Sequence, residues 1–170
     1  CETPYVYDDA VGHDINQGDV GDCYMCTILN ALAVTHFELI KAVFSQRFHA
    51  SASGCYSLRL CDPRTKQWVY VLVDDYVPVR YGEPCFLKSK NKNEMWCSLL
   101  EKAMAKLAGS YARIDARFQP MTPILSSYGA LEVMEMLTGS IGLGVTFWTG
   151  NNSSTAVWDK LQEVIVNRWP

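Results

Sequence analysis

The chain has 170 residues, of which 49% are hydrophobic, 19% charged and 12% aromatic, and its formal net charge at pH 7 is −3. This length corresponds to about one domain, and the apolar content is sufficient for a buried core, which excludes an intrinsically disordered chain. The 15 basic and 18 acidic residues form no basic stripe, so no nucleic acid is expected as the main partner. No apolar run reaches the roughly 18 residues of a transmembrane segment.

The sequence begins with Cys1 rather than Met and shows no signal-peptide pattern. We therefore expect it to be a piece of a longer protein. Its cysteines are odd in number and follow no regular spacing: Cys1, Cys23, Cys26, Cys55, Cys61, Cys85 and Cys97. Since a chain of this composition can build a core without crosslinks, the pattern favours free thiols in a reducing compartment, and hence a cytoplasmic location.

Residues 1–20 are polar and turn-rich, which predicts an ordered loop, and the first helix is predicted directly after it. Asp22 is a suitable N-cap, so Cys23 is expected at the first position of a long apolar helix. A second helical stretch is predicted over residues 37–44. The apolar side chains of the first helix recur at helical spacing: Met25, Ile28, Leu29, Leu32 and Ala33.

A β-hairpin is predicted in the middle of the chain. Residues 55–60 alternate like a strand, residues 62–65 form a turn, and residues 67–73 are rich in β-forming side chains. A further helix is predicted from Asn93, and Gly109 is expected to end it. The apolar positions of this helix lie on one stripe: Trp96, Leu99, Leu100, Ala103 and Leu107.

The C-terminal part is predicted to hold a short helix over residues 129–137, a strand over 145–148 and a helix over 155–169. Because helices precede and follow a central hairpin, rather than alternating with strands, the order predicts an α+β fold and not a Rossmann fold. The glycine-rich residues 139–144 lack the full glycine fingerprint and the Lys-Ser/Thr pair of a phosphate-binding loop.

The residues that carry chemistry lie at the start of the first predicted helix, in the segment 17–24. A cysteine in the first turn is close to unpaired backbone N–H groups and to the positive end of the helix dipole, and both favour the nucleophilic thiolate. The amide of Gln17, together with the backbone N–H of Cys23, is suited to form an oxyanion hole for acyl transfer. These local features leave a second interpretation open, in which Cys23 is only a small buried residue of the helix.

Several stretches of the chain form an ordered set of motifs. They are residues 17–24 with the following 29–33, the strand 68–78 that ends in two aspartates and a proline, the helical residues 93–111, and Thr138-Gly139. Over residues 8–139 these motifs resemble the protease core of the calpain family of cysteine proteases. The resemblance implies a papain-like fold. Its helical half, with Cys23 and the hairpin, would be residues 1–139, and residues 140–170 would begin the second, β-rich half.

The resemblance also implies roles for individual residues. Cys23 takes the place of the nucleophile and Gln17 that of the oxyanion-hole donor. A calcium site is implied as well, built from two carboxylates and two backbone carbonyls, the oxygen ligands that this cation takes: Asp14, Glu94, Tyr7 and Asp9. The residues themselves leave open that the two carboxylates are only solvated or capping acids.

The function that the resemblance implies is that of a calcium-dependent intracellular endopeptidase. Its substrates would be proteins or peptides, and further domains would belong to the same polypeptide. A catalytically inactive calpain-like scaffold or regulatory module is the alternative.

Some positions depart from the family pattern. Tyr24 stands in place of the usual tryptophan after the nucleophile, and Gly12 in place of an arginine expected to form an interdomain salt bridge. Asp9 replaces a glycine at one of the calcium-binding carbonyls. Ala116 and Arg117 fall near the paired glycines that line the substrate cleft, so a side chain is expected to intrude where bare backbone would otherwise lie.

The chain has no histidine at the place expected for the catalytic base. A thiolate needs a His to protonate the leaving amine, and an Asn or Asp to orient that His. The histidines present are His13, His36 and His49, and His36 would lie ~20 Å from Cys23 along an unbroken helix. In papain-like enzymes the His follows the Cys by about 130–150 residues. We therefore expect the base and its Asn beyond Pro170, and no peptidase activity from residues 1–170 alone.

The residues also suggest three alternatives to a protease. Gly12 and the replacement of the paired glycines by Ala116 and Arg117 favour the inactive scaffold, whereas the retained Gln17 and Cys23 favour an enzyme. The pair Cys23 and Cys26 has the spacing of a redox motif, but a thioredoxin-like protein requires a strand before this helix, which the sequence does not provide. A zinc site would require a second closely spaced pair.

Overall fold

The computed structural model of the chain describes residue 6 and residues 15–45, 51–91, 93–118 and 129–140. Its helices are α1 (Cys23–Thr35), α2 (Phe37–Lys41), α3 (Trp96–Ala108), α4 (Tyr111–Ile114) and α5 (Gly129–Thr138), with a 3-10 helix at Ala116–Phe118. Its strands are β1 (Ile15–Asn16), β2 (Cys55–Asp62), β3 (Gln67–Asp74), β4 (Val79–Arg80), β5 (Glu83–Pro84) and β6 (Lys88–Ser89). This mixture of helices and antiparallel strands agrees with the predicted α+β class.

The helices follow the apolar patterns of the sequence. α1 begins at Cys23, as predicted. α3 begins at Trp96, later than predicted, and ends at Gly109, whose φ of 111° gives the left-handed C-cap that other residues avoid. α2 and α5 confirm the other two helices predicted within the described residues, although α2 already ends at Lys41. The residues that α1 buries are Met25, Leu29, Leu32 and Ala33.

β2 and β3 form the predicted antiparallel hairpin and are paired over their whole length. Alternate side chains of β2, at Tyr56, Leu58 and Leu60, are fully buried. Tyr70 and Leu72 of β3 point to the opposite face and are exposed. One face of the hairpin therefore belongs to the core, and the other does not.

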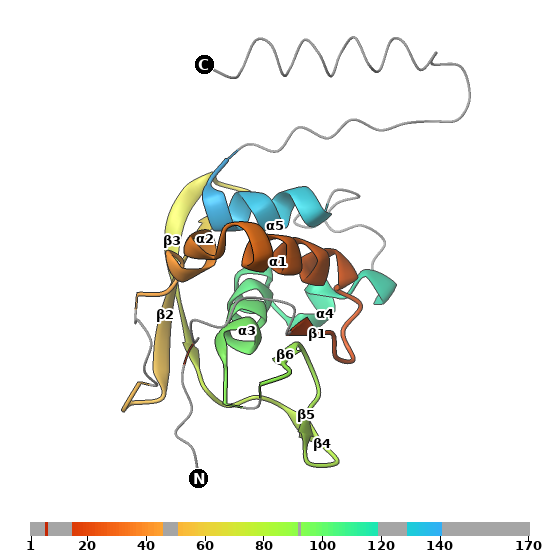
Figure 1. Ribbon diagram of the computed structural model, residues 1–170. Coiled ribbons are helices and arrows are strands. Elements are labelled where there is room, and N and C mark those ends of the chain that lie inside the picture. Colours follow the sequence, from red (N-terminus) through yellow and green to blue (C-terminus); the bar gives the residue numbers. More distant parts are fainter. Residues whose placement is uncertain (1–5, 7–14, 46–50, 92, 119–128, 141–170) are drawn as a thin grey trace, which may run out of the picture.

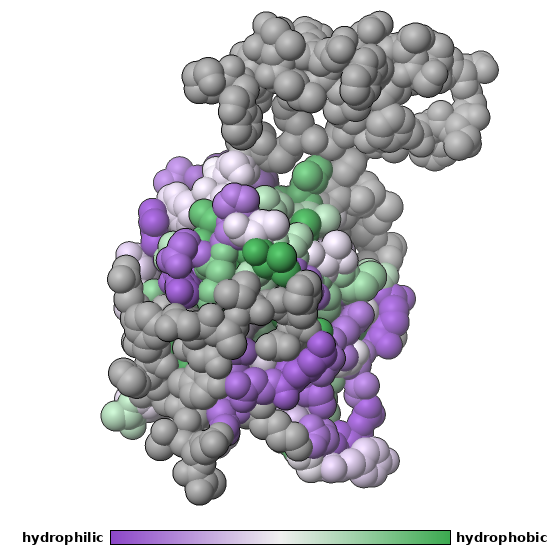
Figure 2. All heavy atoms as spheres, in the orientation of Figure 1, coloured by the Kyte–Doolittle hydropathy of each residue, from purple (hydrophilic) through white to green (hydrophobic). Residues whose placement is uncertain are grey.

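One group of buried apolar side chains joins the helices to the hairpin. α1 packs against α2 and α5, α5 also contacts β2, and α3 packs against β3, so these helices cover one side of the hairpin (Figure 1). In Figure 2, hydrophilic side chains gather in the lower part of this face of the molecule, toward β4, β5 and β6. None of the helices in the described ranges is long and apolar enough to cross a membrane.

The short strands were not predicted. β1 pairs antiparallel with β6 and places Ile15 opposite Ser89. β4 and β5 form a small hairpin whose turn residues, Tyr81 and Gly82, both have positive φ (54° and 83°), as a type I′ turn requires. The predicted strand 145–148, the predicted helix 155–169 and most of the N-terminal loop lie outside the described residues.

Candidate active site around Cys23

The structure places Cys23 at the first position of α1 with an exposed side chain. The carbonyl of Asp22 accepts hydrogen bonds from the backbone N–H groups of Met25 (2.8 Å) and Cys26 (3.1 Å). Asp22 is therefore the N-cap, as predicted, but its side chain makes no capping hydrogen bond. An exposed sulfur beside N–H groups that have no partner inside the helix is suited to act as a nucleophile. The interpretation of Cys23 as a buried core residue is wrong.

The loop that precedes α1 is held against the segment before β6. Gly18 lies so close to this segment that a Cβ atom would be 2.2 Å from the carbonyl oxygen of Cys85 and 2.4 Å from the Cα of Phe86. The N–H of Asp19 donates to the same carbonyl at 2.7 Å, and Arg80 of β4 pairs with the Asp19 carboxylate. Only a glycine lets the loop approach this backbone so closely.

A second attachment of the loop comes from the segment after α4. The N–H of Ala116 donates to the carbonyl of Gly21 at 3.0 Å, and the Arg117 guanidinium donates to the carbonyl of Asp19. Arg117 also forms a bidentate pair with Asp115 (2.9 and 2.6 Å), and this pair lowers the pKa of the Asp115 carboxyl to about 2. The sequence predicts only that a side chain intrudes here, where the family has bare backbone. It does not predict that Arg117 holds the loop.

Gln17 lies in the same loop, and its amide is already hydrogen-bonded. The amide nitrogen donates to the carbonyl of Val20 at 2.8 Å, and the side chain also interacts with the carboxyl of Asp22. An oxyanion hole requires a donor directed at the reacting carbonyl. The structure thus brings Gln17 and Cys23 to the same loop–helix junction, but it directs the amide to the loop itself.

Next to Cys23, Asp22 and Glu101 form a pair of buried carboxyl groups that links α1 to α3. Their exposed fractions are 0% and 1%, and one Glu101 oxygen accepts the N–H of Leu87 at 3.0 Å. The remaining oxygens, Asp22 Oδ2 and Glu101 Oε1, have no other donor within the described residues. Burial raises the pKa of Asp22, and burial together with the charge of Asp22 raises that of Glu101 to about 9. At neutral pH, one proton shared by the two carboxyls satisfies both oxygens.

This pair predicts that the free energy of unfolding falls as the pH rises from about 5 to about 9. In this range folded Glu101 keeps a proton that the unfolded chain releases, because its pKa is raised to about 9. The stabilisation by protonated Glu101 is complete below the pKa that Glu101 has in the unfolded chain. It is lost as the pH rises through the pKa that Glu101 has in the folded protein. Glu101→Gln retains an oxygen for the Leu87 N–H, and we expect it to remove most of this pH dependence.

Urea unfolding at several pH values measures this effect. Glu38→Gln is the matched control, because its side chain in α2 is 85% exposed and its loss should leave the pH dependence unchanged. Equal pH dependence in the wild type and in Glu101→Gln would contradict the shared proton.

Tyr24, which differs from the family pattern, fixes α1 to its neighbours. Its hydroxyl donates to the carbonyl of Ile114 at 2.8 Å. Its ring lies against Gly129 at the start of α5, where a Cβ atom would be 3.0 Å from the ring. The residue after the nucleophile therefore holds the helix that carries the thiol.

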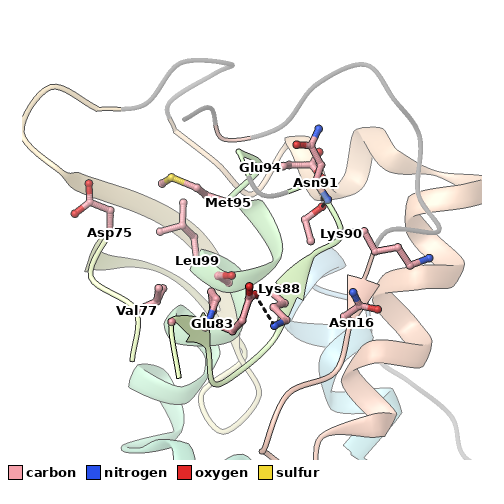
Figure 3. Close-up of a pocket in the computed structure, with 14 residues that line it drawn as sticks. Asn16, Asp75, Val77, Glu83, Lys88, Lys90, Asn91, Glu94, Met95 and Leu99 are labelled. Carbon is pink, nitrogen blue, oxygen red and sulfur yellow. Dashed lines mark hydrogen bonds and ion pairs between the residues drawn. The ribbon is translucent and has the colours of Figure 1, made fainter. Parts of the chain in front are cut away.

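Glu94 lies at one end of a pocket of about 550 Å³ (Figure 3). Glu94 is only 6% exposed, and its Oε2 accepts the hydroxyl of Ser89 at 2.6 Å. At the other end of the pocket, Lys88 pairs with Glu83 at 3.2 Å. The described residues contain no group of three or more His, Cys, Asp or Glu side chains that could hold a metal ion, so a cation at Glu94 would need further ligands.

Val6 and Ile15, the described residues on either side of positions 7–14, both lie beside Glu94. On one side, the carbonyl of Val6 accepts the N–H of Trp96 at 2.8 Å. On the other, Ile15 pairs with Ser89, the residue that bonds Glu94. The other residues predicted to bind calcium, which lie within this segment, are outside the described residues: Tyr7, Asp9 and Asp14.

Of the three histidines, only His36 lies within the described residues, and it directly follows α1. α1 runs unbroken from Cys23 to Thr35, so it separates the imidazole from the thiol by ~20 Å. This is too far for proton transfer. His13 and His49 lie outside the described residues.

Sequence reasoning missed Glu101 and the partners of the loop. The sequence does indicate that Glu101 is buried, because Glu101 lies at helical spacing with the buried residues Cys97, Met104 and Ala108 of α3. A carboxyl group in such a stripe indicates a buried acid. No sequence pattern marks the contact of Gly18 with Cys85, which joins segments far apart in the chain.

The site as a whole consists of an exposed thiol at a helix N-terminus and a fixed loop that carries an amide side chain. This arrangement is typical of enzymes that use a cysteine nucleophile. The sequence profile described as "Calpain family cysteine protease" matches residues 1–168. The chain therefore belongs to the calpain family of cysteine proteases.

Curated proteins similar to the chain carry calpain names. Calpain-8 of Mus musculus is 35% identical over 113 residues, which cover 65% of the chain and 16% of that protein. The calpain-1 catalytic subunit of Rattus norvegicus is 34% identical over 145 residues (85% and 18%), and calpain-5 of Mus musculus is 32% identical over 123 residues (68% and 19%). The chain thus spans less than a fifth of the length of these relatives.

Proposed function

We propose that the chain carries the nucleophile of a calcium-dependent cysteine endopeptidase that cleaves protein or peptide substrates. The observation that carries the proposal is the exposed Cys23 thiol at the first position of α1, in a chain of this family. In this proposal residues 1–139 form the first subdomain of a papain-like core, and residues 140–170 begin the second. The protein would act in the cytoplasm and would contain further domains.

In the proposed reaction, the sulfur of Cys23 attacks the scissile carbonyl carbon and forms a thioester, while the amine leaves with a proton. The N–H of Cys23 and the amide of Gln17 stabilise the oxyanion. For this step Gln17 gives up its hydrogen bond to Val20 and donates to the substrate. The His that protonates the amine, and the Asn that orients it, come from beyond Pro170, so residues 1–170 alone would have no activity.

Calcium is proposed to bind at Glu94, with Asp14 and the backbone carbonyls of Tyr7 and Asp9 as further ligands. Two observations support this site. Val6 and Ile15, the described residues that flank the positions of the other ligands, both lie beside Glu94, and a carboxylate oxygen is a ligand that calcium takes. A cation bound there would be connected along the chain, through β1, to the active-site loop.

The full-length protein tests the proposed function in a casein cleavage assay. We expect cleavage in excess calcium and none when a chelator removes the ion. No cleavage under either condition would contradict the enzyme. It would favour the inactive scaffold, which is supported by the bonded amide of Gln17 and by Arg117 near the place of a family glycine.

Glu94→Gln is expected to raise the calcium concentration for half-maximal cleavage by at least about tenfold, because it removes a charged ligand of the ion. Calcium titrations of cleavage and of binding heat in the full-length protein measure this shift. Glu83→Gln is the matched control, since Glu83 lines the same pocket but is exposed. Equal calcium requirements in the two variants would contradict the site.

A further inference from the structure

Cys23 and Cys26 form a pair of thiols on the first turn of α1. Cys23 is exposed and Cys26 is half-buried. Side chains three residues apart on a helix have Cβ atoms about 5–6 Å apart, which is only slightly more than the distance of about 3.5–4.5 Å across a disulfide. The pair therefore needs a small local adjustment, and no rearrangement of the fold, to become bonded.

The first turn of α1 can make this adjustment. The carbonyl of Asp22 accepts the N–H of Met25 as well as that of Cys26, so the turn already combines 3-10 and α-helical hydrogen bonds. Tightening toward 3-10 geometry brings residues three apart into line. Cys23 is the first residue of the helix, so its N–H has no partner inside the helix. Its carbonyl accepts the hydroxyl of Thr27 at 2.8 Å, so the adjustment must come from the side chain and the N-terminal side of the residue.

The buried carboxyl of Asp22 provides a proton acceptor for the second thiol. Its Oδ1 lies 4.0 Å from the Sγ of Cys26, and its Oδ2 has no partner in the described residues other than the shared proton. Burial, followed by the charges of Asp22 and Glu101, raises the pKa of Cys26 to about 12. Cys26 therefore stays a thiol that is protected from direct oxidation, and it needs a base before it can act as a nucleophile.

We propose that Cys23 and Cys26 form a reversible disulfide when the protein meets a hydroperoxide. The Cys23 thiolate attacks the terminal oxygen of the peroxide, the O–O bond breaks, and the sulfur becomes a sulfenic acid. The hydroxide or alkoxide that leaves takes up the proton that the Cys23 thiol had released and departs as water or an alcohol. Cys26 then passes its proton to Asp22 and attacks the Cys23 sulfur. The S–O bond breaks, hydroxide leaves and takes the proton as water, and the two thiols have lost two electrons to the peroxide. A dithiol reductant reverses the reaction and restores the nucleophile.

The experiment detects the bond itself, so its result does not depend on whether the protein cleaves substrates. The full-length protein is treated with a small excess of hydrogen peroxide, its free thiols are blocked with N-ethylmaleimide, and it is digested with chymotrypsin. Cleavage after Tyr24 puts Cys23 and Cys26 on separate fragments. We expect mass spectrometry to find these fragments joined, and dithiothreitol to separate them and restore the labelling of Cys23.

Cys26→Ser removes the second thiol, so oxidation of Cys23 should continue to the sulfinic acid, which dithiothreitol does not reduce. We expect the labelling of Cys23 that dithiothreitol recovers to be at least about tenfold lower than in the wild type. Cys55→Ser, which removes an exposed thiol of β2, should behave like the wild type. A bond from Cys23 to Cys85 or Cys1, or equal recovery in wild type and Cys26→Ser, would overturn the proposal.

Discussion

Replacing Cys23 with serine is expected to slow substrate cleavage by the full-length protein by about 10⁵-fold or more, the loss that follows removal of an enzyme's nucleophile. A serine hydroxyl at this place stays protonated and is a far weaker nucleophile than a thiolate, so the covalent intermediate does not form. The side chain is exposed at the first position of α1, so the exchange of sulfur for oxygen removes little packing. Casein cleavage in calcium measures the loss, and an unchanged melting temperature would show that the fold is intact.

Cys55→Ser is the matched control for this variant, because Cys55 is also exposed but lies at the start of β2. It is expected to keep the activity of the wild type. Activity that survives in Cys23→Ser, or an equal loss in both variants, would contradict the role of Cys23 as the nucleophile.

The position of Cys23 could be predicted because local features determine it. Asp22 before an apolar stretch with helical spacing predicts where α1 begins, and the structure confirms that start. Gly109 likewise marks the end of α3 through a left-handed cap. The hairpin of β2 and β3 was also predictable, since its strands and its turn are adjacent in the sequence.

The surroundings of Cys23 could not be predicted in the same way, because they depend on contacts between distant segments. The bond from Ala116 to Gly21 and the contact of Gly18 with Cys85 arise only after the helices and strands have packed. The amide of Gln17 shows the same limit. Its residue type suits an oxyanion hole, but the conformation of the loop decides which acceptor the amide meets, and here the acceptor is Val20.

Gly18→Ala is expected to destabilise the protein by about 2–4 kcal/mol, the cost of forcing backbone segments apart. The added Cβ would lie 2.2 Å from the carbonyl oxygen of Cys85 and within 2.5 Å of two backbone atoms of Phe86. Backbone atoms cannot rotate away as a side chain can, so the loop must move. This movement would break the hydrogen bond from Asp19 to Cys85 and displace the loop that leads to Cys23. Urea unfolding measures the loss of stability, and the rate of iodoacetamide labelling of Cys23 reports the displacement.

Gly21→Ala is the matched control, because it adds the same methyl group to the same loop. The nearest atoms to its Cβ would be Asp115 Oδ1 at 2.6 Å and Arg117 Cγ at 2.9 Å, both in side chains. Arg117 is largely exposed and can shift, whereas Asp115 is buried and can move only a little. We therefore expect a smaller loss than for Gly18→Ala, of about 1–2 kcal/mol. If Gly18→Ala loses no more stability than Gly21→Ala, the backbone contact at Cys85 does not hold the loop. The attachment through Ala116 and Arg117 would then be the one that positions the thiol.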